Sequence, residues 1–283
     1  MKVVVAQGCG FCPGVRNAIK IAQQTLSKRK NVYSLGEIIH NKDVVRQLAE
    51  AGLKIAENVK QIPAGIVIIR SHGASKRELK QIREKGLKIV DATCILVKRV
   101  QKIANMLHKQ GYKVVIIGDK GHPEVRAVIG SAPNITVIGD KNDINNLNKN
   151  PKLGVICQTT QSPGHFAKMI AQIAKTSFSE MKVINTLCKE AIKRQTCAVQ
   201  LCKQVDIMFV LGGLHSANTK KLAELCKKYN IQTFHLQNWK ELDKSILCGK
   251  NIAGVTAGAS TPQWVISGFV DNLKKFDSGK KKK

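Results

Sequence analysis

Three cysteines recur at matched places along the 283-residue chain, and this repeat limits the possible folds more than any other feature. The cysteines are Cys12 in GCGFCPGVRNAI, Cys94 in VDATCILVKRV and Cys188 in VINTLCKEAIKRQ. Each stands between an apolar run and an amphipathic stretch, a pattern that predicts a strand, a short turn and a helix. The gaps between them are 94 − 12 = 82 and 188 − 94 = 94 residues. The spacing indicates three copies of one unit.

A histidine follows each cysteine at a nearly constant distance, after a second apolar run. The offsets are 40 − 12 = 28 for His40, 122 − 94 = 28 for His122 and 215 − 188 = 27 for His215. Each unit then holds a third apolar run that ends in a loop of small polar residues: AGIVIIRSHGAS, LGVICQTTQS and IAGVTAGAST. Near-continuous Val/Ile strands that alternate with helices indicate parallel sheets covered by helices on both faces.

We therefore predict an α/β fold of three pseudo-repeated units with mainly parallel sheets. The expected units are residues 1–93, 94–186 and 187–276, followed by a basic disordered tail, 277–283. Ligand sites in such folds lie at the carboxyl ends of the strands. Three units around a pseudo-threefold axis would bring the three cysteines to one central site.

Three converging thiolates can hold zinc, with a histidine or water as the fourth ligand, or a 4Fe–4S cluster with one iron lacking a protein thiolate. Structural zinc sites usually take closely spaced ligand pairs, so ligands more than 80 residues apart favour iron–sulfur. Zinc nevertheless stays open at this point. Cys9 and Cys12 also form a CGFC pair typical of thioredoxin-like sites, but that interpretation leaves the other two junctions unexplained.

Polar residues with a shared character surround the predicted strand ends. Histidines, hydroxyls and helix N-termini together suit an anion, with phosphate the natural guest. The residues concerned are His40, His72, His122, Ser216, Asn218 and Ser260. Glu124 lies two residues after His122, and a carboxylate beside an open metal position is a candidate proton donor. The chain has no Walker or dinucleotide fingerprint, so no bound nucleotide is expected.

Composition limits the remaining function classes. The net charge of +28 would attract an anionic substrate, an acidic partner protein or nucleic acid. Only 4% of residues are aromatic and no basic stripe is interleaved with stacking rings, which does not favour nucleic acid. No run of 18 apolar residues predicts a membrane span. Nine cysteines without an export signal suggest the cytoplasm.

Taken together, the motifs closely resemble the LytB family of 4-hydroxy-3-methylbut-2-enyl diphosphate reductases. The matching stretches are GFCPGV, LGEIIHN, SHGAS, DATC, GHPEV, QTTQS, NTLC, RQ and GVTAGAS, in this order. The resemblance implies a trefoil of three units around a central iron–sulfur site, one 4Fe–4S cluster on Cys12, Cys94 and Cys188. It places the diphosphate among the six residues named above, gives proton delivery to Glu124 and puts Thr159 near the substrate hydroxyl.

The implied reaction is the reductive dehydroxylation of (E)-4-hydroxy-3-methylbut-2-enyl diphosphate to isopentenyl and dimethylallyl diphosphates. This is the last step of the non-mevalonate isoprenoid pathway, and an acidic ferredoxin or flavodoxin is the expected electron donor. Two other classes remain as alternatives: a metal-dependent nucleic-acid-binding protein, and a cluster-dependent dehydratase that needs no net electron input.

Several positions depart from the family pattern. The loop GGLHSANTKK stands where a run like SKNSSNS is expected, with His215 for an asparagine and Ala217 for a serine. KEAIKRQ after Cys188 lacks an expected threonine, and Ile95 replaces a usual proline. The predicted cluster ligands and Glu124 are unchanged, so these departures bear on diphosphate affinity.

Overall fold

The computed structural model describes residues 1–147, 152–214 and 216–276. The predicted disordered tail, 277–283, and His215 lie outside these residues. The chain divides into two compact units, each described here by itself. The first comprises Met1–Val15, Ile39–Arg46 and the chain from Ile192 onward, and the second comprises Arg16–Ile38 and Gln47–Ala191.

Three four-stranded sheets form the framework, and every strand pair in them is parallel. In spatial order, one sheet is β3 (Leu53–Ala56), β2 (Val32–Leu35), β4 (Ile66–Ile69) and β5 (Lys88–Asp91). The next is β7 (Thr136–Ile138), β6 (Lys113–Ile117), β8 (Lys152–Cys157) and β9 (Glu180–Val183). The last is β11 (Thr233–Leu236), β10 (Ile207–Leu211), β12 (Ile252–Ala257) and β1 (Lys2–Val5). The predicted α/β fold with repeated parallel sheets is confirmed.

Helices connect the strands, as parallel pairing requires. They are α1 (Pro13–Leu26), α2 (Lys42–Glu50), α3 (Lys76–Glu84), α4 (Ile95–Lys109), α5 (Pro123–Ile129), α6 (Pro163–Ile173), α7 (Lys189–Cys202), α8 (Ala217–Lys227) and α9 (Gln263–Lys275). Short 3₁₀ turns add η1 (Val59–Gln61), η2 (Lys141–Asn146), η3 (Trp239–Glu241) and η4 (Lys244–Leu247). Within the described ranges, no helix combines the length and apolarity that crossing a membrane would require.

The three sheets share one strand order, which identifies the repeat. The edge strands β5, β9 and β1 occupy the same position beside β4, β8 and β12. Each of these edge strands precedes one of the three cysteines, and each cysteine directly precedes a helix: α4, α7 or α1. The predicted strand–cysteine–helix junctions are therefore present three times.

The third sheet takes its edge strand from the start of the chain. Lys2–Val5 pairs with β12 from Lys2 opposite Ile252 to Val5 opposite Val255. The third sheet is therefore not built from one consecutive segment of the chain. β1 takes the edge position that, in the other two sheets, belongs to the strand directly after α3 or α6. The segment boundaries predicted after residues 93, 186 and 276 stay a prediction.

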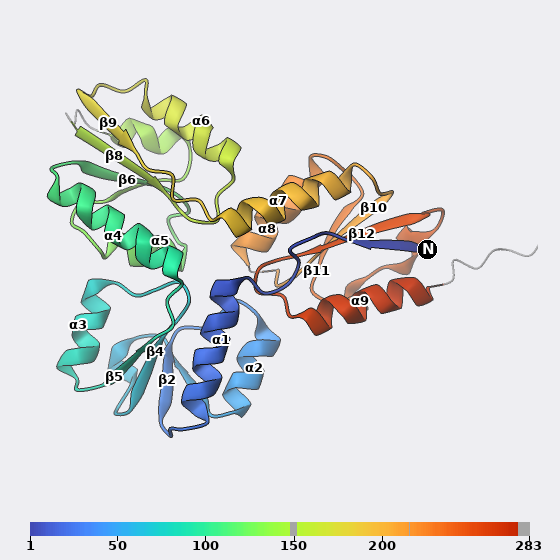
Figure 1. Cartoon of the computed structure of the whole chain (residues 1–283), viewed down its shortest axis with the longest axis horizontal. Helices are drawn as coiled ribbons and strands as arrows, with labels where there is room; N and C mark the ends of the chain where they lie inside the picture. Colours follow the sequence, from blue (N-terminus) through green and yellow to red (C-terminus); the bar gives the residue numbers. More distant parts are fainter. Residues whose placement is uncertain (148–151, 215, 277–283) are drawn as a thin grey trace, which may run out of the picture. The chain divides into compact units, whose positions relative to one another are not determined.

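Helices cover both faces of the second sheet, as near-continuous apolar strands require. One face packs Val114, Ile116 and Ile156 against Val100, Ala104 and Leu107 of α4. The other packs Val115, Ile117 and Val155 against Phe166, Met169 and Ile173 of α6. Figure 1 shows α4 and α6 on opposite sides of this sheet. Alternate residues of one strand thus serve two separate cores.

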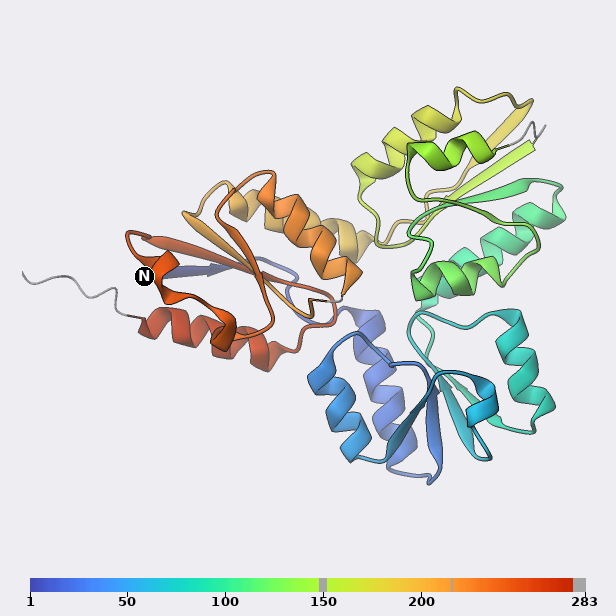
Figure 2. The same cartoon turned by 180° about the vertical axis from the view of Figure 1, so that it is seen from behind.

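The third sheet is built in the same way. Phe209 and Val255 pack against α9 on one face, while Met208 and Val210 pack against α7 and α8 on the other. Figure 2 shows α9 on one side of the sheet and the other two helices opposite it. The Phe209 ring lies 5.1 Å from that of Phe269, centroid to centroid, in a tilted pair.

Phe209→Ala tests this core. The buried ring would leave a cavity between β10 and α9, so we expect the free energy of unfolding to fall by about 3–5 kcal/mol. Trp264→Ala is the control, because Trp264 lies on α9 with 51% of its surface exposed and its loss should cost less than about 0.5 kcal/mol. Urea unfolding followed by circular dichroism measures both. Equal losses would show that Phe209 is not a core anchor.

Candidate functional site

One hydrogen bond recurs at all three predicted ligand cysteines. In each case the backbone N–H of the cysteine donates to a carbonyl in the loop after the strand next to the edge. The pairs are Cys12 to Ala259 at 3.2 Å, Cys94 to Ser71 at 3.0 Å and Cys188 to Thr159 at 2.8 Å. These loops follow β12, β4 and β8 respectively. Equivalent bonds place the three cysteines at equivalent points of three repeats.

The surroundings of the three thiols suit metal-binding thiolates. Each cysteine is partly exposed, forms no disulfide and stands at the start of a helix of 14 or 15 residues. The positive end of a helix dipole stabilises a thiolate. The Cys12 sulfur additionally accepts a hydrogen bond from the backbone N–H of Val15 at 3.4 Å.

The three side chains are thiols, which as thiolates bind zinc or iron–sulfur clusters. Across the described chain, no three His, Cys, Asp or Glu side chains gather closely enough to hold a single metal ion. Cys12 belongs to the first compact unit, and Cys94 and Cys188 belong to the second. Each repeat thus carries one thiol at the same structural position.

Glu124 and Thr159 form a buried pair within the second unit. The carboxylate, 2% exposed, accepts the Thr159 backbone N–H at 2.7 Å through Oε1 and the Thr159 hydroxyl at 2.9 Å through Oε2. The carbonyl of the same threonine holds the Cys188 backbone N–H. The predicted proton donor is thus tied directly to the loop that supports a predicted ligand cysteine.

His72 and His122 also come together. His72 follows β4 of the first sheet and His122 caps α5 beside the second, yet their rings meet edge to face with centroids 5.5 Å apart. His122 Nδ1 accepts the backbone N–H of Glu124 at 3.2 Å. In a neutral ring the proton then sits on Nε2, which becomes a donor.

The remaining predicted anion ligands lie in the first unit. Ser260 donates its hydroxyl to the His40 carbonyl at 3.1 Å, which joins the loop after β12 to the segment before α2. Ser216 caps α8 by accepting the Thr219 N–H at 3.4 Å. The Asn218 side-chain oxygen is buried with no hydrogen-bond partner among the described residues. A buried amide of this kind has hydrogen-bonding capacity left for a polar ligand.

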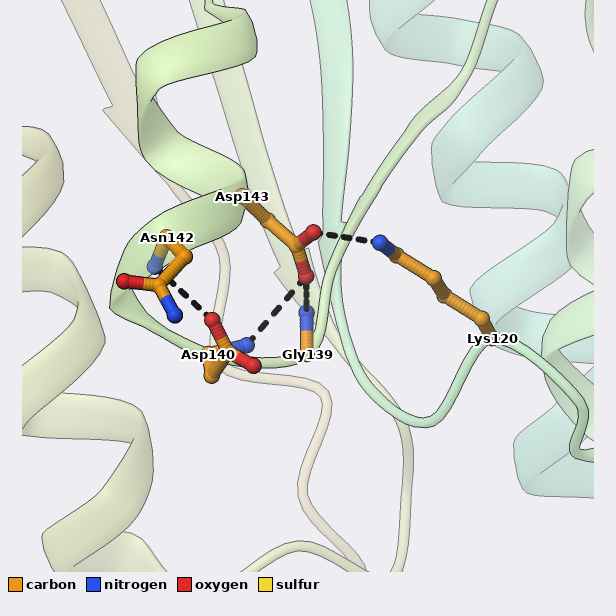
Figure 3. Close-up of polar contacts among 5 residues, drawn as sticks. All are labelled: Lys120, Gly139, Asp140, Asn142 and Asp143. Carbon is orange, nitrogen blue, oxygen red and sulfur yellow. Dashed lines mark hydrogen bonds and ion pairs between the residues drawn. The ribbon is translucent and has the colours of Figure 1, made fainter.

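An ion pair holds the loop between β6 and α5, which ends at His122, the N-cap residue of α5. Lys120, in this loop, pairs with Asp143 of η2 (Figure 3). Asp143 also accepts the backbone N–H groups of Gly139 at 2.8 Å and Asp140 at 3.3 Å. The hydrogen bond from Lys120 is the main cause that lowers the pKa of the Asp143 carboxyl.

Sequence reasoning missed three supporting side chains. Arg194, buried in α7, donates to the Ala257 carbonyl at 2.9 Å, and Gln158 accepts the Asp119 N–H at 2.9 Å. Gln101 of α4 donates to the carbonyls of Ala74 and Ala127 at 3.1 and 3.0 Å. Arg194 and Gln158 lie in the matched RQ and QTTQS motifs, which were the available signal. Gln101 gave a weaker one, a polar residue inside an apolar-periodic helix.

The fold and these residues define a class of α/β protein in which three repeats each contribute one cysteine and a group of polar side chains. The sequence pattern of the family described as LytB protein matches residues 3–274. The chain belongs to the LytB family.

Curated relatives match over nearly the whole chain. A 4-hydroxy-3-methylbut-2-enyl diphosphate reductase of Syntrophotalea carbinolica is 40% identical over 275 residues, which cover 96% of this chain and 98% of the relative. The protein of the same name from Geobacter sulfurreducens is 39% identical over 282 residues, with 99% and 100% covered.

Solved structures agree with the fold. A structure of (E)-4-hydroxy-3-methyl-but-2-enyl diphosphate reductase, described as the terminal enzyme of the non-mevalonate pathway, is 36% identical with a TM-score of 0.72, covering 98% of this chain and 100% of that one. The E-1-hydroxy-2-methyl-but-2-enyl-4-diphosphate reductase of Plasmodium falciparum is 29% identical with a TM-score of 0.93, covering 98% and 89%.

Asp143→Asn tests the loop anchor through pH. A carboxyl whose pKa is lowered on folding stabilises the fold above its unfolded value, near 3.9, and this contribution is lost as pH falls through the lower folded value. We expect the variant to be less stable than the unaltered protein at pH 7 and the difference to shrink towards pH 3. Thermal unfolding at both pH values measures it, with Asp271→Asn on the exposed side of α9 as control. A pH-independent difference would contradict the ion pair.

Proposed function

We propose that the chain is a 4-hydroxy-3-methylbut-2-enyl diphosphate reductase, an oxidoreductase. It removes the allylic hydroxyl of (E)-4-hydroxy-3-methylbut-2-enyl diphosphate and yields isopentenyl and dimethylallyl diphosphates, the last step of the non-mevalonate pathway. The observation that carries the proposal is the recurrence of one cysteine hydrogen bond at the three family motifs GFCPGV, DATC and NTLC. The full-length relatives of this name support the same activity.

Cys12, Cys94 and Cys188 would hold one 4Fe–4S cluster. When bound, the cluster supplies an iron without a protein thiolate as a Lewis acid and a route for single electrons. The equivalent positions of the three thiols and the helix N-terminus at each support this assignment.

The diphosphate would be held by hydrogen-bond donors, which suit an anion. The His122 ring, whose Nδ1 accepts the Glu124 N–H, can donate through Nε2 to a phosphate oxygen. Asn218 has unused capacity in its amide, and its oxygen and nitrogen can exchange places to present the NH₂ group. Five further side chains or caps complete the proposed set: His40, His72, Ser216, Ser260 and the N-terminus of α8.

Glu124 would deliver the proton to the leaving oxygen. As a carboxylate it accepts both Thr159 hydrogen bonds, which orient both of its oxygens. When Glu124 is protonated, the Thr159 hydroxyl can rotate from donor to acceptor, so the pair keeps its contact in both states. Thr159 would thus hold the carboxyl in place and lie beside the substrate hydroxyl.

The remaining assignments concern partners and compartment. A reductive dehydroxylation consumes two electrons and two protons and releases water, so an electron donor is required. An acidic ferredoxin or flavodoxin suits a chain of net charge +28. All nine cysteines lie in the described ranges and none is in a disulfide, which suits a reducing cytoplasm.

The decisive experiment is anaerobic reconstitution with iron and sulfide, followed by turnover with a reduced viologen dye and the hydroxylated allylic diphosphate. We expect brown protein with about four irons per chain and dye-dependent formation of both products. Products that form without the dye would indicate the dehydratase alternative. Protein that retains zinc and shows no turnover would overturn the proposal.

Replacing one predicted ligand should remove the cluster. We expect Cys94→Ser to retain well under half of the iron of the unaltered protein and to lose turnover, because one of three thiolates is missing. Cys248→Ser is the matched control, since Cys248 is exposed and stands before no helix of the repeat. Iron analysis and visible absorbance of both proteins measure the effect. Equal iron in both variants would remove Cys94 from the ligand set.

Replacing the proposed proton donor should affect turnover but not cluster content. We expect Glu124→Gln to keep its iron and to lose about 10²- to 10⁴-fold in kcat. Thr159→Val, which removes the hydroxyl that orients Glu124, should lose less, and Thr159→Ser should restore most of the loss. Dye-driven kinetics measure all three. A fully active Glu124→Gln protein would require another proton donor.

A further inference from the structure

Helix α4 presents a cationic face that starts beside a predicted cluster ligand. Its buried residues are Val97, Val100, Ala104 and Leu107, and the last three pack on the second sheet. The opposite side follows the helical spacing i, i+3, i+4, i+7, i+11 and i+14. The residues on it, which we call the α4 cationic face, are Ile95, Lys98, Arg99, Lys102, Met106 and Lys109. No residue of α4 is acidic.

Two large apolar side chains interrupt the positive charge on this face. Ile95 is 79% exposed and directly follows Cys94, and Met106 is 38% exposed three turns further on. Apolar groups surrounded by polar, solvent-accessible residues are the usual composition of a protein–protein interface. The equivalent positions after Cys12 and Cys188 hold Pro13 and Lys189, so neither α1 nor α7 opens on an exposed apolar side chain of this size.

A groove between α3 and α4 extends the same surface. It has a volume of about 270 Å³, and its walls include Leu79, Lys76 and Lys102. Asp91 is the one carboxylate among the described residues that line it, and it pairs with Lys98 at 2.6 Å. Lys76 donates to Asn105 at 3.1 Å and keeps its charge at the rim. The surface therefore stays strongly positive after its internal ion pair is counted.

We propose that the α4 cationic face is the docking surface for an acidic one-electron carrier protein. The inference rests on the proposed function, in which each turnover takes two electrons and two protons to replace the substrate C–OH by C–H and release water. A carrier that gives up one electron per encounter must dock twice, and its cofactor must approach a cluster ligand. A partner on the first turns of α4 lies next to Cys94.

Electrostatics and surface chemistry favour a protein carrier on this face. Opposite charge speeds encounter and orients the partner, while transient redox complexes use small interfaces that separate quickly. The face has no Phe, Tyr or Trp, so it lacks the stacking platforms with which proteins hold single-stranded nucleic acid. Ile95 supplies an exposed apolar contact at the end of the face next to Cys94, with Lys98 and Arg99 one turn away.

A charge-reversal pair with a matched control tests the proposal. Arg99→Glu/Lys102→Glu alters the α4 cationic face, and Lys227→Glu/Lys228→Glu makes the same charge change at the exposed end of α8. Anaerobic holoenzyme is assayed with a reduced acidic plant-type ferredoxin and, separately, with reduced viologen. We expect the α4 variant to need at least about tenfold more ferredoxin for half-maximal rate, and the control less than about twofold more. Viologen-driven rates should match the unaltered protein in both.

Binding provides a second readout that does not depend on turnover. Calorimetric titration with oxidised ferredoxin should show weaker binding for the α4 variant and for Ile95→Asp, and the unaltered complex should weaken steeply with salt. Equal ferredoxin affinity in the α4 and control variants, with normal viologen turnover, would overturn the docking surface alone. Ferredoxin binding unchanged while a single-stranded RNA loses its binding would also overturn it. An unaltered protein without viologen turnover would overturn the proposed function together with this inference.

Discussion

The hydrogen bond from a cysteine N–H to the neighbouring strand's loop is the contact on which the rest of the site depends. It joins the turn after an edge strand to the carboxyl end of the next strand, and it does so for Cys12, Cys94 and Cys188 alike. Parallel sheets make this possible because all their strands end at one edge, where loops from different parts of the chain meet. The same loops carry His72, Thr159 and Ser260, so the proposed metal ligands and these proposed substrate contacts depend on the same loops. Thr159 illustrates this, because it holds Cys188 by its carbonyl and Glu124 by its amide and hydroxyl.

Much of this arrangement could be predicted from the sequence, because the same local pattern of residues recurs in each repeat. The apolar runs predicted the strands, and the regular spacing of the three cysteines predicted three copies of one unit. The origin of β1 could not be predicted, since pairing between residues 2 and 252 leaves no local trace. Contacts such as the edge-to-face meeting of His72 and His122 also join residues 50 positions apart, and spacing alone does not reveal them. Arg194 and Gln101 were missed for a related reason. Both donate hydrogen bonds to backbone carbonyls, which every residue has, so the partner leaves no pattern in the sequence.

Positive charge favours the expected partners in two ways, one within the proposed site and one over the whole chain. Within the proposed site, helix N-termini, the His122 ring and the Asn218 amide would offer donors to an anion. Over the whole chain, an excess of 47 lysines and arginines over 19 carboxylates attracts acidic proteins from solution. Helix α4 is relevant to both, because it directly follows Cys94 and carries a row of cations on one face. Ile95 stands where the family resemblance leads us to expect proline, and its side chain is 79% exposed, so it leaves the core unchanged.

We propose that the three repeats together hold one four-iron cluster with a single iron free to bind the substrate. Mössbauer spectroscopy of protein reconstituted anaerobically with ⁵⁷Fe, before and after addition of the hydroxylated allylic diphosphate, tests it most directly. We expect about a quarter of the iron signal to change when the diphosphate is added and the rest to stay as it was. A spectrum in which all irons are equivalent and insensitive to the diphosphate would contradict it.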